Sequence, residues 1–235
     1  MTLARAEARN ALPSPAGTRW PRRRSRSPPA IARAVILRSD VPAIFSAGAD
    51  IAEFAAFRRD PAAATRFRLA MRRGIEAVAA LPMPVIAVID GGCYGAAIAL
   101  ILACDPVRRG RRRAIRFDAP PSSGSAIRAR TSRGWVAQVG KGNAARMLFT
   151  GEIVDAADAM AMGLVELRWE EPEPLARAFA DRIAANAPGA MRLLKATLAD
   201  PADPALDAAF DARFAGAELA EGLAAFRERR RPAFP

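Results

Sequence analysis

Two stretches of small and apolar residues decide the fold: Phe45-Ser46-Ala47-Gly48-Ala49-Asp50-Ile51 and Pro84-Val85-Ile86-Ala87-Val88-Ile89-Asp90-Gly91-Gly92-Cys93-Tyr94-Gly95-Ala96-Ala97. Each is predicted to combine a buried strand with a turn of small residues, the first after the apolar run 34–37. Small residues let the backbone approach a ligand closely. Two such turns can therefore place two backbone N–H groups around one carbonyl oxygen, an arrangement that stabilises the enolate of a thioester without a reactive side chain.

The composition limits the chemistry that the chain can perform. Its 235 residues fit one domain, or a domain with an appendage, and no apolar run reaches the roughly 18 residues that a membrane span needs. The two cysteines, Cys93 and Cys104, lie in apolar segments, so we expect no disulfides and a cytoplasmic location. The chain has no histidine, which excludes Ser-His-Asp and Cys-His catalysis and histidine-based metal sites, and we expect no metal.

Arginine supplies most of a net charge of +12, concentrated in residues 19–33 and 107–117, which contain no acid. Such runs can bind the phosphates of a nucleic acid or a cofactor, and the alternative is a solvated loop. Only Trp20 and Trp135 lie near them as aromatic residues that could stack on bases, so we do not expect a nucleic-acid partner. No apolar segment follows the basic N-terminal run before Ala34, which argues against a secretory signal, while an organellar transit peptide stays open.

Hydrophobic patterns along the chain predict an α/β fold with a covered sheet, because strands and helices alternate. We expect a core over residues 1–165, irregular at 13–32 and 106–135, and a helical region over 166–235. The tail at 227–232 is expected to be solvated. The expected elements are a strand and turn in 1–12, strands at 33–39 and 84–89, helices at 60–81, 96–104, 143–151, 155–163 and 204–228, and a helix at 173–199 interrupted near Pro188.

An ordered set of motifs resembles the crotonase superfamily, the enoyl-CoA hydratase/isomerase family, over most of the chain. No single motif is specific, but their order and spacing together are. The matching segments are Ala8-Arg9-Asn10-Ala11-Leu12, Phe45 to Ile51, Pro84 to Gly91, Gly95 to Asp105, Phe149-Thr150-Gly151 through Gly163-Leu164-Val165, and Glu221 to Phe226 before Arg231-Pro232-Ala233-Phe234.

The resemblance implies a spiral of ββα units (the crotonase, or ClpP-like, fold) whose helical C-terminal region forms a homotrimer or hexamer. It implies an acyl-CoA or enoyl-CoA substrate of fatty acid metabolism, no separate cofactor, and lyase or isomerase activity. Residue by residue, the oxyanion-hole N–H groups fall on Ala49 and Ala96, and the alternative is two ordinary turns. The CoA-binding positions fall on Ala47, Gly48, Asp50, Ile51 and Gly95.

The chain departs from the family pattern at both positions where hydratases carry a catalytic glutamate. These positions hold Ala99 and Pro121, and neither side chain can transfer a proton. Asp118 is the substitute acid–base candidate, with a surface carboxylate as the alternative. Hydration, isomerisation, hydrolysis and no reaction at all therefore stay open.

Other polar residues near the two turns have simpler structural interpretations. We expect Asp50 and Glu53 to cap or pair at the start of a helix. Tyr94 either donates to a carbonyl or packs, and packing is the simpler interpretation. The two cysteines are expected to be small buried apolar residues.

Arginine, serine and proline rise sharply in the two irregular blocks, and the family-like pattern returns in register after each. We hypothesise that one or both blocks arose from compensating frameshifts in a GC-rich gene or from sequencing errors, which the DNA sequence would test. The alternative function is a catalytically inactive scaffold or nucleic-acid-binding protein that uses the arginine-rich segments. Salt-dependent retention on heparin without acyl-CoA binding would distinguish it.

Overall fold

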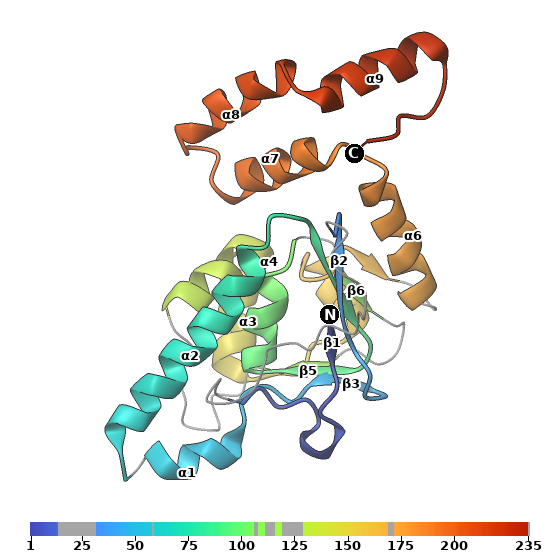
Figure 1. The fold of residues 1–235 in the computed structure, drawn as a ribbon. Helices are drawn as coiled ribbons and strands as arrows, with labels where there is room; N and C mark the ends of the chain where they lie inside the picture. The colour runs from blue at the N-terminus through green and yellow to red at the C-terminus, as the bar shows by residue number, and fades with distance from the viewer. Residues whose placement is uncertain are drawn as a thin grey trace.

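The structure is a computed structural model that describes residues 1–13, 32–57, 59–105, 108–110, 116–118, 129–168 and 172–234. Within these residues, two sheets of parallel strands form the centre of the molecule (Figure 1). The larger sheet has the order β1 (Thr2–Leu3), β2 (Val35–Ser39), β4 (Val85–Ile89), β6 (Arg108–Gly110), β8 (Leu167–Arg168), and the smaller has the order β3 (Ile44–Ser46), β5 (Gly92–Tyr94), β7 (Arg116–Asp118).

Successive strand pairs alternate between the two sheets. The pairs β2–β3, β4–β5 and β6–β7 each give one strand to the larger sheet and one to the smaller, and every neighbouring pair is parallel. Parallel neighbours require crossover connections, and helices follow each pair: α1 and α2 after β3, α3 after β5 and α4 after β7. The fold is therefore the spiral of ββα units that the family resemblance implied.

Helices surround the sheets and extend beyond them. Asp155 begins one predicted helix, because its side chain accepts hydrogen bonds from the N–H groups of Ala157 and Asp158. Gly163 follows it with a φ of +76°, as a helix stop requires. The helices are η1 (Ala6–Ala8), η2 (Ile51–Glu53), α1 (Phe54–Phe57), α2 (Pro61–Ala79), α3 (Ala96–Leu102), α4 (Ala129–Thr150), α5 (Ala156–Ala161), α6 (Pro172–Ala184), α7 (Pro188–Ala199), α8 (Ala205–Phe214) and α9 (Ala217–Glu228).

The hydrophobic core lies between β4, α3 and α4. Every residue of β4 is buried, as the continuous apolar run predicted, and α3 buries four of its residues. Cys93 and Cys104 are buried within this core as free thiols, as expected. Trp135 of α4 is completely buried beside them. The fully buried strand β4 thus leads into β5, from which the second turn starts.

The expectation of irregular structure over 106–135 is wrong in part. Residues 108–110 and 116–118 form β6 and β7, and α4 begins at Ala129 and kinks at Gly140. Strand pairing uses backbone groups, so β6 and β7 join β4 and β5 without an apolar sequence pattern. The other predicted irregular block, 13–32, lies outside the described residues except at its two ends.

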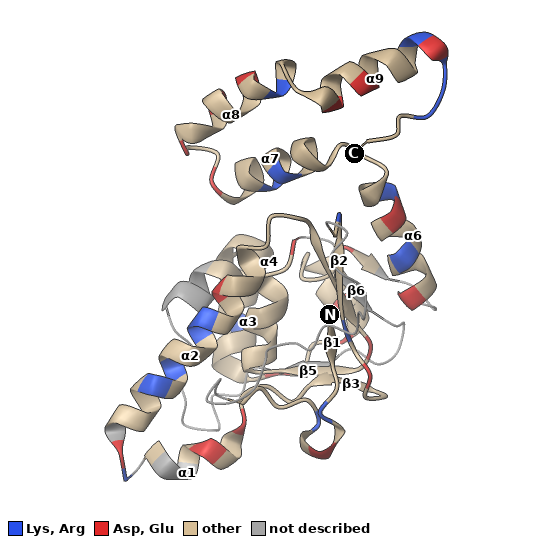
Figure 2. Ribbon diagram, in the orientation of Figure 1, with Lys and Arg blue, Asp and Glu red and all other residues tan. Residues whose placement is uncertain are grey.

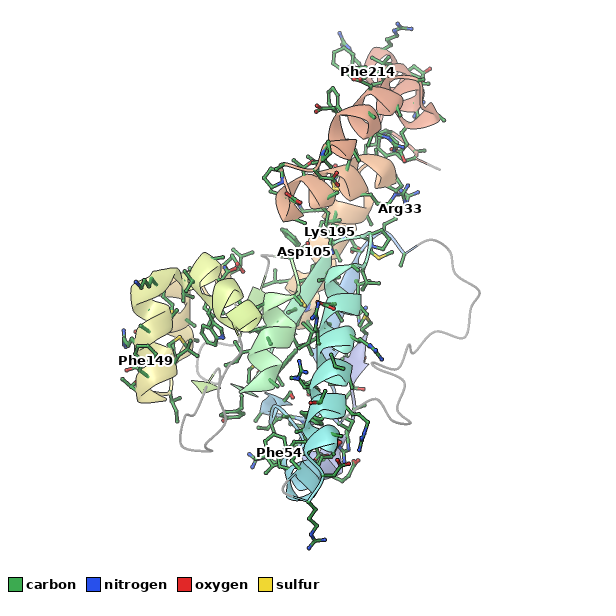
Figure 3. The ribbon with its side chains drawn as sticks, turned by 90° about the vertical axis from the view of Figure 1, so that its left-hand side faces the viewer. Arg33, Phe54, Asp105, Phe149, Lys195 and Phe214 are labelled. Atoms are coloured by element: carbon green, nitrogen blue, oxygen red, sulfur yellow. The ribbon has the colours of Figure 1, made fainter. Side chains whose placement is uncertain are left out.

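The helices α7, α8 and α9 form an arm beside the core (Figure 1). The predicted single helix at 204–228 is two helices, since Gly216 separates α8 from α9. At the base of the arm, Lys195 Nζ donates to Asp105 Oδ2 at 2.8 Å and to the Met83 carbonyl at 3.0 Å (Figure 3). Within the arm, the Glu218 carboxylate accepts from the Gly189 N–H at the start of α7.

The C-terminal tail at 227–232 is exposed to solvent, as its charge predicted, and hydrogen bonds also hold it in place. Arg230 donates to both carboxylate oxygens of Glu221, at 2.6 and 2.9 Å, and the Ala233 N–H donates to the same group. Arg33 then donates to the Phe234 and Ala184 carbonyls, which ties the tail and the end of α6 to β2.

In the part of the chain that the structure describes, no helix is long and apolar enough to span a membrane.

Candidate functional site

The first turn begins where β3 ends at Ser46 and is held against the N-terminal segment. Leu12 donates its N–H to the Gly48 carbonyl at 2.7 Å and accepts at its own carbonyl from Asp50 N–H at 3.0 Å. Ala49 lies between these bonds, in an isolated parallel bridge with Leu12. A trans peptide points its N–H opposite to its C=O. The Ala49 N–H therefore points away from Leu12, toward the other side of the turn.

The second turn connects β5 to α3. Gly95 adopts a φ of +49°, a conformation that favours glycine, and α3 starts at the next residue, Ala96. The first N–H groups of a helix have no acceptor within the helix and carry a partial positive charge. The Ala96 N–H is the first of these groups in α3.

The two turns lie against each other. A Cβ atom added to Gly48 would be 2.5 Å from the Tyr94 carbonyl oxygen and 3.3 Å from the Ala96 nitrogen. The pairing of β3 with β5, with Ser46 opposite Cys93, produces this approach. The structure thus brings together the backbone of the first predicted site segment and the nitrogen of Ala96, through a glycine that could not carry a side chain.

Two of the predicted CoA-binding positions have clear local environments. The Asp50 carboxylate accepts from Arg5 Nη1 at 2.7 Å and caps η2 by accepting from Ala52 N–H at 3.2 Å. It therefore has the capping and pairing role that the sequence indicated. This hydrogen bond raises the pKa of Arg5. Ile51 next to it is 69% exposed, and an apolar side chain so exposed is available to a ligand.

The acid–base positions differ in how far the structure describes them. Ala99 lies half-buried on α3, on the helix that starts at Ala96. Asp118 ends β7 directly beside Tyr94 of β5, while its side chain and Pro121 lie outside the described parts. The Tyr94 ring packs over Gly92, where a Cβ would meet it at 2.3 Å, which favours its packing interpretation.

Sequence reasoning did not identify Leu12 and Ser46 as residues that shape the site. Ser46 belongs to the first motif, where the sequence indicates only that a small residue is needed. Its complete burial is unusual for a serine and is visible only once the fold is known. Leu12 acts through its backbone, so its side chain carried no signal.

The described residues do not support base stacking. Trp135 is completely buried, so the suggestion that it could stack on bases is wrong. Trp20 lies outside the described residues. Basic residues lie along α2 (Figure 2), and two of them pair with acids, Arg66 with Asp60 and Arg72 with Glu76.

Comparison with known proteins places this geometry in a family. Residues 23–235 match the family model for enoyl-CoA hydratase/isomerase. A putative enoyl-CoA hydratase of Thermus thermophilus is 33% identical over 213 residues, covering 86% of this chain and 83% of that protein. Mouse mitochondrial methylglutaconyl-CoA hydratase is 28% identical, covering 86% of this chain and 68% of the relative, and the chain covers 62% of the human counterpart.

Solved structures agree with the sequence comparison. The crystal structure of an enoyl-CoA hydratase/carnithine racemase from Magnetospirillum magneticum superposes with a TM-score of 0.83 at 33% identity. The match covers 100% of this chain and 90% of that one. The spiral of ββα units, the two converging turns and these similarities lead to one conclusion: the chain belongs to the enoyl-CoA hydratase/isomerase family of the crotonase superfamily.

Proposed function

We propose that this protein binds an acyl-CoA or enoyl-CoA thioester and polarises its carbonyl with the backbone N–H groups of Ala49 and Ala96. Two donors aimed at one oxygen stabilise the negative charge of an enolate. The observation that carries the proposal is the contact between the two turns, where the Gly48 backbone abuts the Ala96 nitrogen and the Ala49 N–H faces away from Leu12.

We propose further that the hydration step is slow in this protein. The first position at which the family resemblance expects a glutamate holds Ala99, whose methyl group cannot transfer a proton. The thioester would then be bound and polarised, and proton transfer would depend on water or on Asp118. Two other reactions of the bound thioester, isomerisation and hydrolysis, should therefore be tested together with hydration.

The test measures binding and turnover for a panel of enoyl- and acyl-CoA thioesters. Calorimetry with butyryl-CoA, which cannot be hydrated, reports binding alone. Ala96→Pro removes one donor without forbidding the helix, because proline is tolerated at the first helical position. We expect about fivefold weaker binding from the loss of one hydrogen bond of about 1 kcal/mol. Any turnover should fall about 100-fold or more.

Ala217→Pro is the matched control. It places proline at the first position of α9, far along the chain from both turns, where the preceding Gly216 is already extended. This variant should bind and turn over like the wild type. A wild-type protein that binds none of the thioesters would refute the proposal, and heparin retention in the same sample would favour the scaffold or nucleic-acid alternative.

We also propose that copies of this chain assemble through the arm. Several large apolar side chains on α7–α9 are exposed in the single chain, and exposed apolar surface of this kind marks an interaction site. Phe149 at the end of α4 is also exposed, on the core (Figure 3). The exposed apolar residues of the arm are Leu194, Leu198, Phe210, Phe214, Leu219, Leu223 and Phe226. A homotrimer or hexamer would cover them.

A further inference from the structure

Ser46 lies completely buried at the end of β3 with both kinds of hydrogen bond satisfied. Its Oγ donates to the Asn10 carbonyl at 2.7 Å and accepts from the Gly48 N–H at 3.2 Å. A hydroxyl has one proton to donate. Because that proton goes to Asn10, the lone pairs of Oγ are left to face Gly48, and the bond to the Gly48 N–H has a fixed direction.

Asn10 holds this arrangement in place. It adopts a left-handed φ of +54°, which asparagine tolerates better than most residues. Its side chain accepts from the Arg5 N–H at 2.8 Å and donates to Ser39 Oγ at 2.8 Å and to the Phe45 carbonyl at 3.0 Å. The acceptor of the Ser46 proton is therefore itself fixed within a satisfied, buried network.

Gly48 is held from both sides. Ser46 accepts from its N–H, and Leu12 donates to its C=O. Glycine is the residue with the greatest backbone freedom, and its φ here is +89°. These two bonds remove that freedom and fix the plane of the peptide between Gly48 and Ala49. The same plane carries the Ala49 N–H.

We propose that Ser46 is a positioning residue that sets the direction of the Ala49 N–H. It acts through Gly48 and touches no substrate. Without its hydroxyl, the Gly48 N–H loses its fixed acceptor, and the Leu12 bond alone holds the peptide between Gly48 and Ala49, so the Ala49 N–H is aimed less firmly at the carbonyl oxygen. This inference rests on the proposed function, because it assigns a direction to one of the two proposed donors.

The test is isotope-edited infrared spectroscopy of butyryl-CoA labelled with ¹³C at the thioester carbonyl. Hydrogen bonds to a carbonyl lower its stretching frequency, so the bound label reports polarisation directly. We expect a clear downshift in the wild type and less than half of it in Ser46→Ala. The Kd for free CoA, which has no thioester carbonyl, should be equal in both proteins, a result that general damage to the fold would not give.

Ser39→Ala is the matched control, because it removes a hydroxyl from the same network. Ser39 bonds to Asn10 and Val41 rather than to Gly48. This variant should keep the wild-type downshift. An equal downshift in Ser46→Ala would overturn the positioning role and leave the proposed function intact, whereas a wild type without binding or without a downshift would overturn both.

The wild type alone supplies a second test that does not depend on the variant folding. Selective ¹⁵N-glycine labelling makes the Gly48 amide observable by NMR among the 16 glycines of the chain. The bond to Ser46 should protect this amide from hydrogen exchange to a degree similar to amides of the neighbouring strands. Exchange at the rate of a free amide would overturn the proposal.

Discussion

Position 48 accepts glycine alone for two separate reasons. Its φ of +89° is strained for any residue with a side chain, and a Cβ would lie 2.5 Å from the Tyr94 carbonyl oxygen. The clash is with backbone, which cannot move aside as the end of a long side chain can. Gly48 thus keeps the two turns in contact, and the proposed donors depend on that contact.

Gly48→Ala should separate the turns. We expect the free energy of unfolding to fall by about 1–3 kcal/mol, from the strained φ and the clash, and butyryl-CoA binding to be lost. Urea denaturation and calorimetry check the two effects. Gly222→Ala is the control, since a Cβ there meets nothing within 4 Å. In the interior of α9 it should raise stability by about 0.5–1 kcal/mol. Normal binding by Gly48→Ala would contradict this description of the turns.

The small residues of the two turns could be predicted from the sequence, because their type and spacing carry the signal. The buried hydrogen bonds that hold the first turn, made by Asn10 and Ser46, could not be predicted from the sequence. Asn10 and Ser46 are 36 residues apart along the chain, and their bond appears only when the N-terminal segment folds against β3. Asp50 shows the opposite case, because a cap is a local feature that its sequence context indicated.

The base of α7 depends on one ion pair. The Lys195 side chain is 11% exposed and the Asp105 side chain 25%, and Asp105 also accepts from the Val85 N–H at the start of β4. The pair therefore joins the arm to the strand that leads to the second turn. Both groups are shielded enough for the interaction to exceed the value of an ordinary surface pair.

Lys195→Met should weaken this junction, because it leaves the Asp105 carboxylate without its cation. We expect the free energy of unfolding to fall by about 1.5–3 kcal/mol, as for a hydrogen bond to a charged group. Faster proteolysis between α6 and α7 should accompany the loss. Lys141→Met, at the other lysine of the chain and on the exposed surface of α4, should change stability by about 0.5 kcal/mol or less. Equal effects from the two variants would contradict the role of the pair.

The hydrogen bonds from Arg230 and Ala233 to Glu221, here called the tail clamp, predict how the stability of the C-terminal tail depends on pH. Hydrogen bonds from Arg230, and next from the Ala233 N–H, lower the pKa of Glu221 from 4.5 to about 2. A lowered carboxyl pKa stabilises the folded tail above pH 4.5, and this contribution is lost as the pH falls through about 2. Carboxyl ¹³C NMR should show Glu221 titrating near pH 2, and Arg230→Gln should raise its pKa. If the Glu221 carboxyl of the wild type titrated near pH 4.5 instead, the tail clamp would not form in solution.

Helices and strands with a strong hydrophobic or capping pattern could be predicted from the sequence, and those without such a pattern could not. The continuous apolar run of β4 and the Asp155 cap gave correct elements. The strands β6 and β7 escaped prediction because their short sequences carry no apolar run, whereas their pairing with β4 and β5 uses backbone groups. The break between α8 and α9 escaped because Gly216 alone marks it within an otherwise helical pattern.

Across the described parts of the molecule, many of the exposed large apolar side chains lie on the arm. Phe226 on α9 is 84% exposed, and Phe149 on the core is 80% exposed. In the proposed assembly, such residues would be covered by another copy. The resemblance suggested a trimer from the sequence, but the surface itself could be read only from the fold, because exposure depends on how the helices pack.

Phe226→Asp should therefore weaken the assembly. Light scattering coupled to size exclusion should show a trimer or hexamer for the wild type and smaller species for the variant, because a charge would be buried at the interface. Arg73→Asp, an exposed position on α2, introduces the same acidic residue away from the arm and should leave the mass unchanged. A monomeric wild type would contradict the proposed assembly.

The crystal structure of the protein with butyryl-CoA tests the central claim most directly. The thioester carbonyl oxygen should lie about 3 Å from both the Ala49 and the Ala96 nitrogens, as donors of an oxyanion hole do. A carbonyl oxygen that contacts neither nitrogen, or a thioester bound in another part of the molecule, would contradict it.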